Sequence, residues 1–354
     1  MLYFLCALAL SILFTLIVRK ISLKLKIVDS PDCNRKKHLQ KTALLGGTAI
    51  FFSFWVIVAY LIFFTNKIGD NIHLISLISI FVGGAILMIL GFFDDKAGLS
   101  PKFRIAISSL AVLIVILFGI DLNAITNPLG GAVKLNFFQF DLGAWGALTL
   151  AGDLIVFFWL MGMIYTTKIL DGLDGLTVGI VAIGAMMIFF LSSTVKFHQA
   201  DVALLSLVLA GSCLGFLIFN FYPAKIFLGE GGGLWLGFML GAMAVVAGGK
   251  IATALLVMAV PVLDLAWVAV ERLRHGDSLF KGDRRHFHYR LVDAGLSHRQ
   301  AVLTFYSIAL IFGISTLVLP SKFKLMVLAI LAVSFVILEI IIRKKYFYGA
   351  QKKH

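Results

Sequence analysis

The stretch Asp171-Gly172-Leu173-Asp174-Gly175-Leu176 lies between two long apolar segments, at about 148–168 and 175–194. An unpaired charge at the centre of a membrane helix costs at least about 2.5–3.5 kcal/mol. We therefore expect the two carboxylates to face a cation, a water-filled cleft or a substrate, or to lie just outside the hydrocarbon. At helical spacing, residues three apart share a face, so both can point at one site. The alternative is a polar loop that only connects two helices.

The composition around this stretch is that of a polytopic membrane protein. The 354 residues are 60% hydrophobic and 14% charged, with a mean hydropathy of +1.01. Soluble domains average about 25% charged residues, which excludes a soluble multi-domain protein. Residues 1–18 are apolar and the basic residues follow them, the reverse of a cleavable signal, so we expect a first membrane helix there. The three cysteines are widely spaced and indicate neither a disulfide framework nor a zinc site.

A membrane-spanning helix needs about 20 apolar residues, and this criterion gives eleven candidates. Their approximate bounds are 2–18, 44–65, 73–93, 105–120, 148–168, 175–194, 202–221, 233–248, 251–270, 301–319 and 324–342. With the N-terminus outside, the inner segments hold 25 of the 31 Lys and Arg residues and the outer segments hold 6. Because this asymmetry follows the positive-inside rule, we predict eleven spans, with the N-terminus outside and the C-terminus in the cytosol.

The predicted architecture is a single all-α membrane domain over residues 1–354, with its site in loops on the cytosolic side. These loops lie at about 19–43, 94–104, 169–176, 222–232 and 271–300. The longest outer loop is 121–147, in which Ala132–Leu142 partly alternates apolar and polar residues. This alternation predicts a small strand pair on the outer face.

Three further polar stretches share the predicted inner side with Asp171 and Asp174. Asp94 and Asp95 end an apolar span, where two adjacent carboxylates are tolerated beside a metal or another cation; the alternative is a solvated helix end. Asn220 precedes a loop that contains Lys225, Glu230 and a glycine run. Glycine-rich backbone ahead of a helix can present N–H groups to an anion.

The fourth stretch is the basic inner loop. It follows Asp264 and contains Arg285, His286 and His288 among further arginines. A generic basic loop would bind anionic lipid headgroups and nothing more. Two imidazoles beside arginines suit a nucleotide diphosphate better than a metal, because nearby positive charge opposes a cation. Carboxylates for Mg²⁺ and cations for phosphate together indicate phosphoryl transfer at a membrane surface. No nucleophile elbow accompanies the histidines, which argues against Ser/His/Asp hydrolysis.

These stretches, in this order, carry a family resemblance over nearly the whole chain. The sequence resembles the polyprenyl-phosphate N-acetylhexosamine-1-phosphate transferases of glycosyltransferase family 4, in the superfamily of the phospho-N-acetylmuramoyl-pentapeptide transferases. The Arg-Arg-His-x-His form at 284–288 resembles the N-acetylglucosamine branch. The motifs are Val28-Asp-Ser-Pro31 through His38 to Gly46-Gly47, Asp94-Asp95 to Leu99-Ser-Pro101, Asp171–Leu176, Asn220 to Pro223-Ala-Lys-Ile-Phe227, and Arg272, Gly276 and Asp283–His288.

The resemblance implies transfer of N-acetylhexosamine-1-phosphate, with GlcNAc-1-phosphate favoured, from a UDP-sugar to undecaprenyl phosphate, with release of UMP, as the first membrane step of surface-glycan or cell-wall assembly. It implies Mg²⁺, with Mn²⁺ as an alternative ion. It also implies a bacterial plasma membrane as the location, with membrane lipids around the site and no nucleic acid as partner, and it leaves a homodimer open. It assigns catalytic roles to Asp94, Asp95, Asp171 and Asp174, metal binding to Glu230 and Asp174, and substrate binding to Asn220, Lys225, Asp264, Arg285, His286 and His288.

Four positions depart from the family pattern. Lys168 and Tyr165 stand where the family usually has Asn, Glu230 stands for Asp, and Tyr289 stands for the last His of the cluster. An ammonium group cannot ligate a metal. We therefore hypothesise that Lys168 and Glu230 form an ion pair in part of the usual metal position, so that metal binding is weak, shifted or absent.

Three alternatives to this transferase stay open at this stage. One is a non-catalytic relative that binds polyprenyl phosphate or a nucleotide sugar. Another is the phospho-N-acetylmuramoyl-pentapeptide branch, which differs in its donor. A transporter is disfavoured, because transporters place their sites near the membrane midplane.

Overall fold

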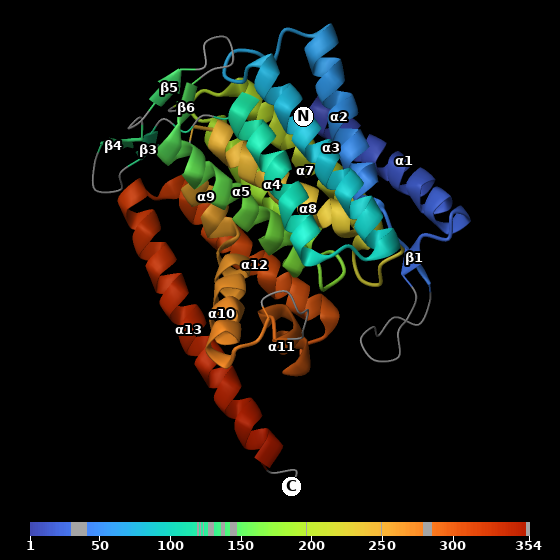
Figure 1. The fold of residues 1–354 in the computed structure, drawn as a ribbon, viewed down its shortest axis with the longest axis vertical. Helices are drawn as coiled ribbons and strands as arrows, with labels where there is room; N and C mark the ends of the chain where they lie inside the picture. Colours follow the sequence, from blue (N-terminus) through green and yellow to red (C-terminus); the bar gives the residue numbers. More distant parts are fainter. Residues whose placement is uncertain are drawn as a thin grey trace.

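The computed structural model describes residues 1–29, 41–118, 120, 122, 124–126, 131–135, 139–141, 147–195, 197–248, 250–278 and 285–351. Within these ranges the protein is a helical bundle with short strand pairs (Figure 1). Its helices are α1 (Leu2–Lys24), α2 (Gly46–Phe64), α3 (Leu74–Ala97), α4 (Pro101–Phe118), α5 (Leu150–Leu170), α6 (Leu176–Ser192), α7 (Ala200–Asn220), α8 (Glu230–Val246), α9 (Ile251–Val257), α10 (Ala259–His275), α11 (Phe287–Asp293), α12 (His298–Val318) and α13 (Ser321–Gln351).

The helices confirm an all-α, multi-pass membrane protein. Among the described residues, eight helices are long and apolar enough to cross a membrane, or nine if the bent pair α9 and α10 counts as one span. The predicted segments 175–194 and 233–248 correspond to the shorter apolar helices α6 and α8. The total of eleven spans and the orientation of the two termini stay predictions.

The predicted span at 251–270 is wrong as a continuous helix. The structure divides it at Met258 into α9 and α10, which meet at an angle of 77°. Pro261 lies in the first turn of α10. Proline lacks the N–H that would continue the helical hydrogen bonding, so it is tolerated at the start of a helix and not inside one. The break directs α10 away from α9 and toward α11 (Figure 1).

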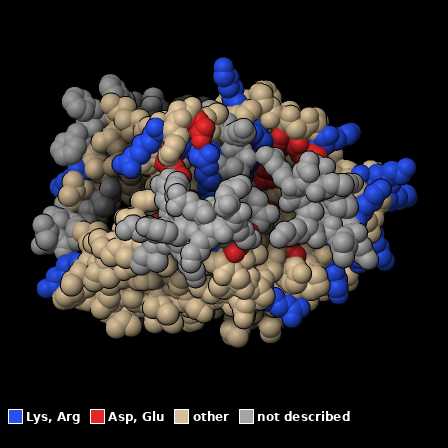
Figure 2. Space-filling view, turned by 90° about the horizontal axis from the view of Figure 1, so that it is seen from below, with Lys and Arg blue, Asp and Glu red and all other residues tan. Residues whose placement is uncertain are grey.

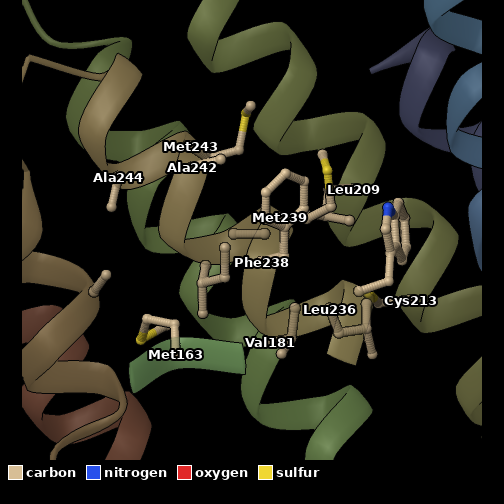
Figure 3. Packing of buried hydrophobic residues seen from close by; sticks show 14 of the residues in the cluster. Met163, Val181, Leu209, Cys213, Leu236, Phe238, Met239, Ala242, Met243 and Ala244 are labelled. Carbon is tan, nitrogen blue, oxygen red and sulfur yellow. The ribbon is translucent and has the colours of Figure 1, made fainter. Parts of the chain in front are cut away.

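Helix α8 lies at the centre of the bundle. Every residue from Gly231 to Val245 is buried, as expected for a helix that is apolar all round and is enclosed by other helices. Figure 3 shows Phe238 and Met239 of α8 packed against Leu209 and Cys213 of α7. The outer helices α1 and α13 instead leave many large apolar side chains exposed, which suits contact with lipid.

Glycines allow the N-terminal end of α8 to approach its neighbours closely. A Cβ atom on Gly91 of α3 would lie 2.8 Å from the carbonyl carbon of Glu230 and closer still to the backbone of Gly231. A Cβ atom on Gly47 of α2 would lie 2.7 Å from the backbone nitrogen of Gly232. The backbones of α2, α3 and α8 are therefore in direct contact, an arrangement typical of small residues between membrane helices.

In the part of the chain that the structure describes, the strands form three two-stranded antiparallel pairs. Strands β3 (Ala124–Thr126) and β4 (Ala132–Lys134) form one pair, and β5 (Gln139–Asp141) and β6 (Ala147–Thr149) form another. The predicted strand pair within 132–142 is thus replaced by two pairs in the same loop, because β4 and β5 each pair with a strand outside that segment. A third pair, β1 (Val28–Asp29) with β2 (Thr42–Ala43), joins α1 to α2 at the opposite end of the bundle (Figure 1).

Candidate active site at one end of the bundle

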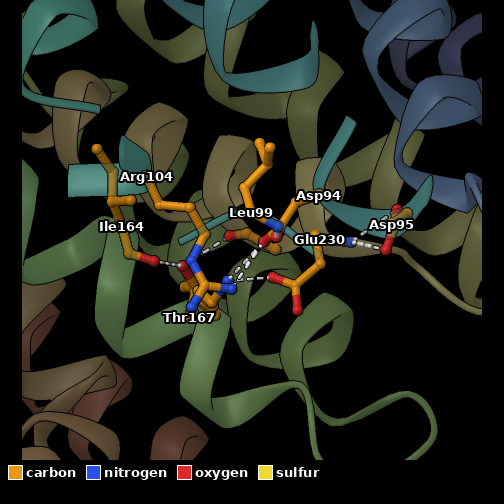
Figure 4. Close-up of polar contacts among 9 residues, drawn as sticks. Asp94, Asp95, Leu99, Arg104, Ile164, Thr167 and Glu230 are labelled. Atoms are coloured by element: carbon orange, nitrogen blue, oxygen red, sulfur yellow. Dashed lines mark hydrogen bonds and ion pairs between the residues drawn. The ribbon is translucent and has the colours of Figure 1, made fainter. Parts of the chain in front are cut away.

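Asp94 is held by three donors at the C-terminal end of α3. The backbone N–H of Leu99 donates to Oδ1 at 2.8 Å, where the chain turns back after α3. On Oδ2, Arg104 of α4 donates at 2.9 Å and Lys168 of α5 lies at 3.4 Å. The Asp94 side chain is only 3% exposed. The two cations therefore compensate a buried carboxylate at the point where α3, α4 and α5 meet (Figure 4).

Glu230, the first residue of α8, completes this cluster. Its Oε2 forms an ion pair with Nζ of Lys168, which confirms the pairing hypothesised from the two substitutions. Its backbone N–H donates to both oxygens of Asp95, at 3.1 and 3.2 Å. The glycine run that was expected to precede a helix lies inside α8 instead, and the first N–H of that helix binds the protein's own Asp95 (Figure 4).

The turn at 171–176 is fixed by contacts from α7 and α12. Oδ2 of Asp174 accepts the backbone N–H of Ala224 at 3.0 Å. Asn220, at the end of α7, accepts the N–H of Gly175 at 3.1 Å and donates to the carbonyl oxygen of Ile226 at 3.0 Å. Tyr306 of α12 donates its hydroxyl to the carbonyl oxygen of Gly175 at 2.5 Å. Gly175 has φ +82°, a conformation that favours glycine.

Asp171 keeps an unusual environment beside this turn. Its side chain is accessible to solvent although it lies in densely packed surroundings. Partial desolvation in these surroundings, together with the carboxylates of Glu230, Asp174 and Asp95, raises the pKa of Asp171 well above its ordinary range. These charges connect the 171–176 turn electrostatically to the Asp95–Glu230 contact.

The histidine cluster reaches the same turn from α11. A Cβ atom on Gly172 would overlap the imidazole of His288 and lie 2.5 Å from the hydroxyl oxygen of Tyr289. Among the described residues, neither of the two buried ring nitrogens of His288 has a hydrogen-bond partner, and burial lowers the pKa of His288 to about 3. A neutral imidazole with unused nitrogens next to an acidic turn is suited to hydrogen-bond a ligand.

His286 is positioned by a buried carboxylate. Its Nδ1 lies 3.0 Å from Oδ2 of Asp264 in α10, and Oδ1 of Asp264 accepts the backbone N–H of Phe287 at 2.8 Å. The rings of His286 and His288 are parallel, with centroids 5.8 Å apart. Asp264 therefore positions the start of α11, which carries both histidines.

The structure brings together most of the predicted site residues and leaves two at the edge. Asp94, Asp95, Asp171, Asp174, Asn220, Glu230, Asp264, His286 and His288 form a chain of contacts and charge interactions at one end of the bundle. The side chain of Lys225 is exposed, and its carbonyl oxygen accepts a hydrogen bond from Arg19. Arg285 pairs with Asp277 at 2.8 Å where both side chains are exposed. The motif residues 30–38, Asp283 and Arg284 lie outside the described residues.

Figure 2 views the molecule from the end that carries this cluster. Acidic side chains lie near the middle of the face and basic side chains lie around and beside them. Arg104 is the last residue of the predicted inner loop 94–104 but has no predicted role, and no sequence motif indicates Tyr306. The signal for Arg104 was its position in the first turn of the helix that follows the acidic pair.

The carboxylates near α8 do not match a divalent-metal site. Within the described ranges, no three His, Cys, Asp or Glu side chains converge as a metal site requires. Asp94 and Glu230 share the Lys168 ammonium, and Asp95 binds a backbone N–H. The 171–176 turn differs, because Mg²⁺ is commonly held by one or two carboxylates together with substrate phosphates. Asp171 is accessible there and Asp174 has one oxygen outside its contact with Ala224.

Comparisons with known proteins identify the relatives of this chain. The model of the family described as glycosyl transferase family 4 matches residues 77–248. The chain is 32% identical over 345 residues to a probable undecaprenyl-phosphate N-acetylglucosaminyl 1-phosphate transferase of Bacillus subtilis, covering 96% of this chain and 90% of that protein. It is 32% identical over 316 residues to a decaprenyl-phosphate N-acetylglucosaminephosphotransferase of Mycobacterium tuberculosis (82% and 74%). It is 30% identical over 321 residues to a phospho-N-acetylmuramoyl-pentapeptide-transferase of Bacillus pumilus (88% and 93%).

The first of these similarities extends over nearly the full length of both chains, and the family model spans the acidic pair, the 171–176 turn and the start of α8. The resemblance based on the sequence motifs is thereby confirmed: the protein belongs to the polyprenyl-phosphate N-acetylhexosamine-1-phosphate transferases of glycosyl transferase family 4.

Proposed function

We propose that this protein transfers N-acetylglucosamine-1-phosphate from UDP-N-acetylglucosamine to undecaprenyl phosphate and releases UMP. One observation carries the proposal: the 171–176 turn touches the histidine helix through Gly172 and interacts electrostatically with the Asp95–Glu230 contact. Carboxylates, imidazoles and cations from six different helices thus lie at one membrane end, where a lipid phosphate and a soluble nucleotide can meet. The names of the relatives support a polyprenyl-phosphate acceptor and the transfer of N-acetylglucosamine phosphate.

A single displacement is enough for this reaction. An oxygen of the lipid phosphate attacks the phosphorus that carries the sugar, the bond from this phosphorus to the bridging oxygen of the diphosphate breaks, and UMP leaves with that oxygen. The nucleophile is already an anion, so the main barrier is the repulsion between two phosphates. Positive groups and hydrogen-bond donors that are fixed before the reaction lower this barrier.

We propose specific roles for the assembled residues. His288 and His286 hydrogen-bond the donor, and Asp264 holds His286 in place. Asp171 and Asp174 face the reacting phosphates from the turn. Mg²⁺, or Mn²⁺, fits best at this turn, where it would neutralise diphosphate charge. The excess of Lys and Arg in the predicted inner loops supports a site on the cytosolic side of the plasma membrane, by the positive-inside rule.

The test is UMP release by the purified full-length protein with undecaprenyl phosphate and a panel of UDP-sugars, with and without Mg²⁺. We expect release with UDP-N-acetylglucosamine and a loss of at least 100-fold in Asp174→Asn. Release only with the UDP-muramoyl-pentapeptide donor would instead assign the protein to that branch. An absence of release with every donor, combined with measurable binding of the nucleotide sugar, would refute catalysis.

The last outcome describes a second candidate function, a non-catalytic relative that binds the lipid phosphate or the nucleotide sugar. The Lys168–Glu230 ion pair favours it, because it occupies carboxylates that could otherwise serve catalysis. The UMP-release assay separates the two functions.

A further inference from the structure

The ammonium group of Lys168 lies between two carboxylates that belong to different helices. Its Nζ forms an ion pair with Oε2 of Glu230, the first residue of α8, and lies 3.4 Å from Oδ2 of Asp94 in α3. Lys168 itself belongs to the last turn of α5 and its side chain is 17% exposed. One monovalent cation thus joins three helices at the acidic end of the bundle, where a bound metal ion would serve the same purpose.

The charges of this cluster nearly balance without any bound ion. Asp94, Asp95 and Glu230 contribute three negative charges, and Lys168 and Arg104 contribute two positive charges. The N-terminus of α8 adds about half a positive charge, and Asp95 already binds its first N–H. A divalent cation added here would leave a net excess of positive charge in a partly buried site, which is unfavourable.

The geometry also opposes a metal at this position. Mg²⁺ requires oxygen ligands at about 2.0–2.1 Å in near-octahedral order, whereas an ammonium group offers three donors and no acceptor. Oδ1 of Asp94 accepts the N–H of Leu99, and Oδ2 accepts Arg104 and Lys168. A metal between Asp94 and Glu230 would have to displace Lys168 from both carboxylates, so the metal and the ammonium exclude each other.

We propose that Lys168 is a built-in cation that replaces a divalent metal between Asp94 and Glu230 and fastens α5 to α3 and α8. These two carboxylates then bind no divalent ion while Lys168 is in place. The proposal is independent of the reaction. Only its catalytic consequence, that any metal used by the enzyme lies elsewhere in the site, rests on the proposed function.

The experiment measures Mn²⁺ binding to the purified full-length protein without substrates, by the loss of the free-ion electron paramagnetic resonance signal. The variants are Lys168→Asn, Glu230→Gln and the double variant. Lys102→Asn is the control, since Lys102 is an exposed lysine at the same end of the bundle. We expect the wild type, Lys102→Asn and Glu230→Gln to bind Mn²⁺ equally weakly. Lys168→Asn should bind it at least 10-fold more tightly, and the double variant should lose this gain.

Thermal unfolding gives a second readout. Lys168→Asn should unfold at a lower temperature than the wild type and Lys102→Asn, because it leaves Asp94 and Glu230 without their shared cation, and Mn²⁺ should restore its stability without affecting the wild type. Equal Mn²⁺ binding by Lys168→Asn and the wild type would overturn the proposal. If Lys168→Asn does not fold, wild type and Glu230→Gln remain comparable: equal binding supports the proposal, and weaker binding by Glu230→Gln overturns it.

Activity separates this inference from the proposed function. If the protein is a transferase, combining Lys168→Asn with Glu230→Asp should increase the dependence of UMP release on Mg²⁺. If no variant or wild-type protein releases UMP, the proposed function fails, while the Mn²⁺ measurements still decide the role of Lys168.

Discussion

Replacing Gly91 by alanine should push α3 and α8 apart and so disturb the site, although Gly91 itself is not a site residue. The new Cβ atom would lie 2.8 Å from the carbonyl carbon of Glu230 and closer to the backbone of Gly231. Carbon atoms in ordinary contact are about 3.5–4.0 Å apart, so α3 and α8 must separate by at least about 0.7 Å. The neighbour is backbone, which cannot rotate away. Overpacking of this kind costs about 1–3 kcal/mol, offset by up to about 1 kcal/mol of improved helix propensity.

The same displacement should disconnect Asp95 from Glu230. Their hydrogen bonds measure 3.1 and 3.2 Å. A further separation of about 0.7 Å would lengthen both N···O distances beyond the roughly 3.6 Å at which a hydrogen bond is lost. We therefore expect Gly91→Ala to lower both the unfolding temperature and the rate of UMP release.

The matched control is Gly162→Ala in α5, because a Cβ atom there would meet nothing within 4 Å. This variant should be as stable as the wild type or slightly more stable, since alanine is the better helix former. Thermal unfolding in detergent, followed by tryptophan fluorescence, measures the difference. If Gly91→Ala unfolds at the wild-type temperature and keeps full activity, the direct backbone contact between α3 and α8 is wrong.

Two further predictions concern the residues around the 171–176 turn. Burial lowers the pKa of His288 to about 3, against about 6.5 in an unfolded chain, so below pH 6.5 the unfolded state binds more protons and the free energy of unfolding falls by about 1.4 kcal/mol per pH unit. His288→Phe should therefore flatten the dependence of stability on pH between about pH 6 and 4, whereas His73→Gln, a control at an exposed histidine, should not. Equal profiles for the wild type and both variants would contradict a buried, neutral imidazole at His288. Asn220→Ala should destabilise the fold by about 2–6 kcal/mol in denaturant titrations, because it leaves two buried backbone groups unpaired at about 1–3 kcal/mol each. Asn220→Asp keeps an acceptor for Gly175 but sets a second oxygen against the carbonyl oxygen of Ile226, so it should also destabilise the fold. A loss below about 0.5 kcal/mol in Asn220→Ala would argue against this bridging role.

The helices and the residue types of the site could be predicted from the sequence, because both depend on local composition. A run of about 20 apolar residues is favourable only in a membrane or a buried core, so the helices appear where the predicted segments lie. The carboxylates and histidines interrupt these runs at considerable energetic cost, which marks them as functional. The residues at 168 and 230 indicated an ion pair, because Lys168 introduces an ammonium group and Glu230 keeps a carboxylate on a longer side chain. The structure contains that pair.

The tertiary structure alone decided which of these residues meet. Arg104 reaches Asp94 because the chain reverses after Gly98, and the bend between α9 and α10 lets Asp264 hold the helix that carries His288. Hydropathy cannot reveal such contacts, since they depend on how closely helix backbones approach, as Gly91 and Gly172 allow. Lys225 and Arg285 were expected at the substrate from their charge, and this stays a prediction. The fold leaves both side chains exposed, because charge specifies a preference for water or anions and not a position.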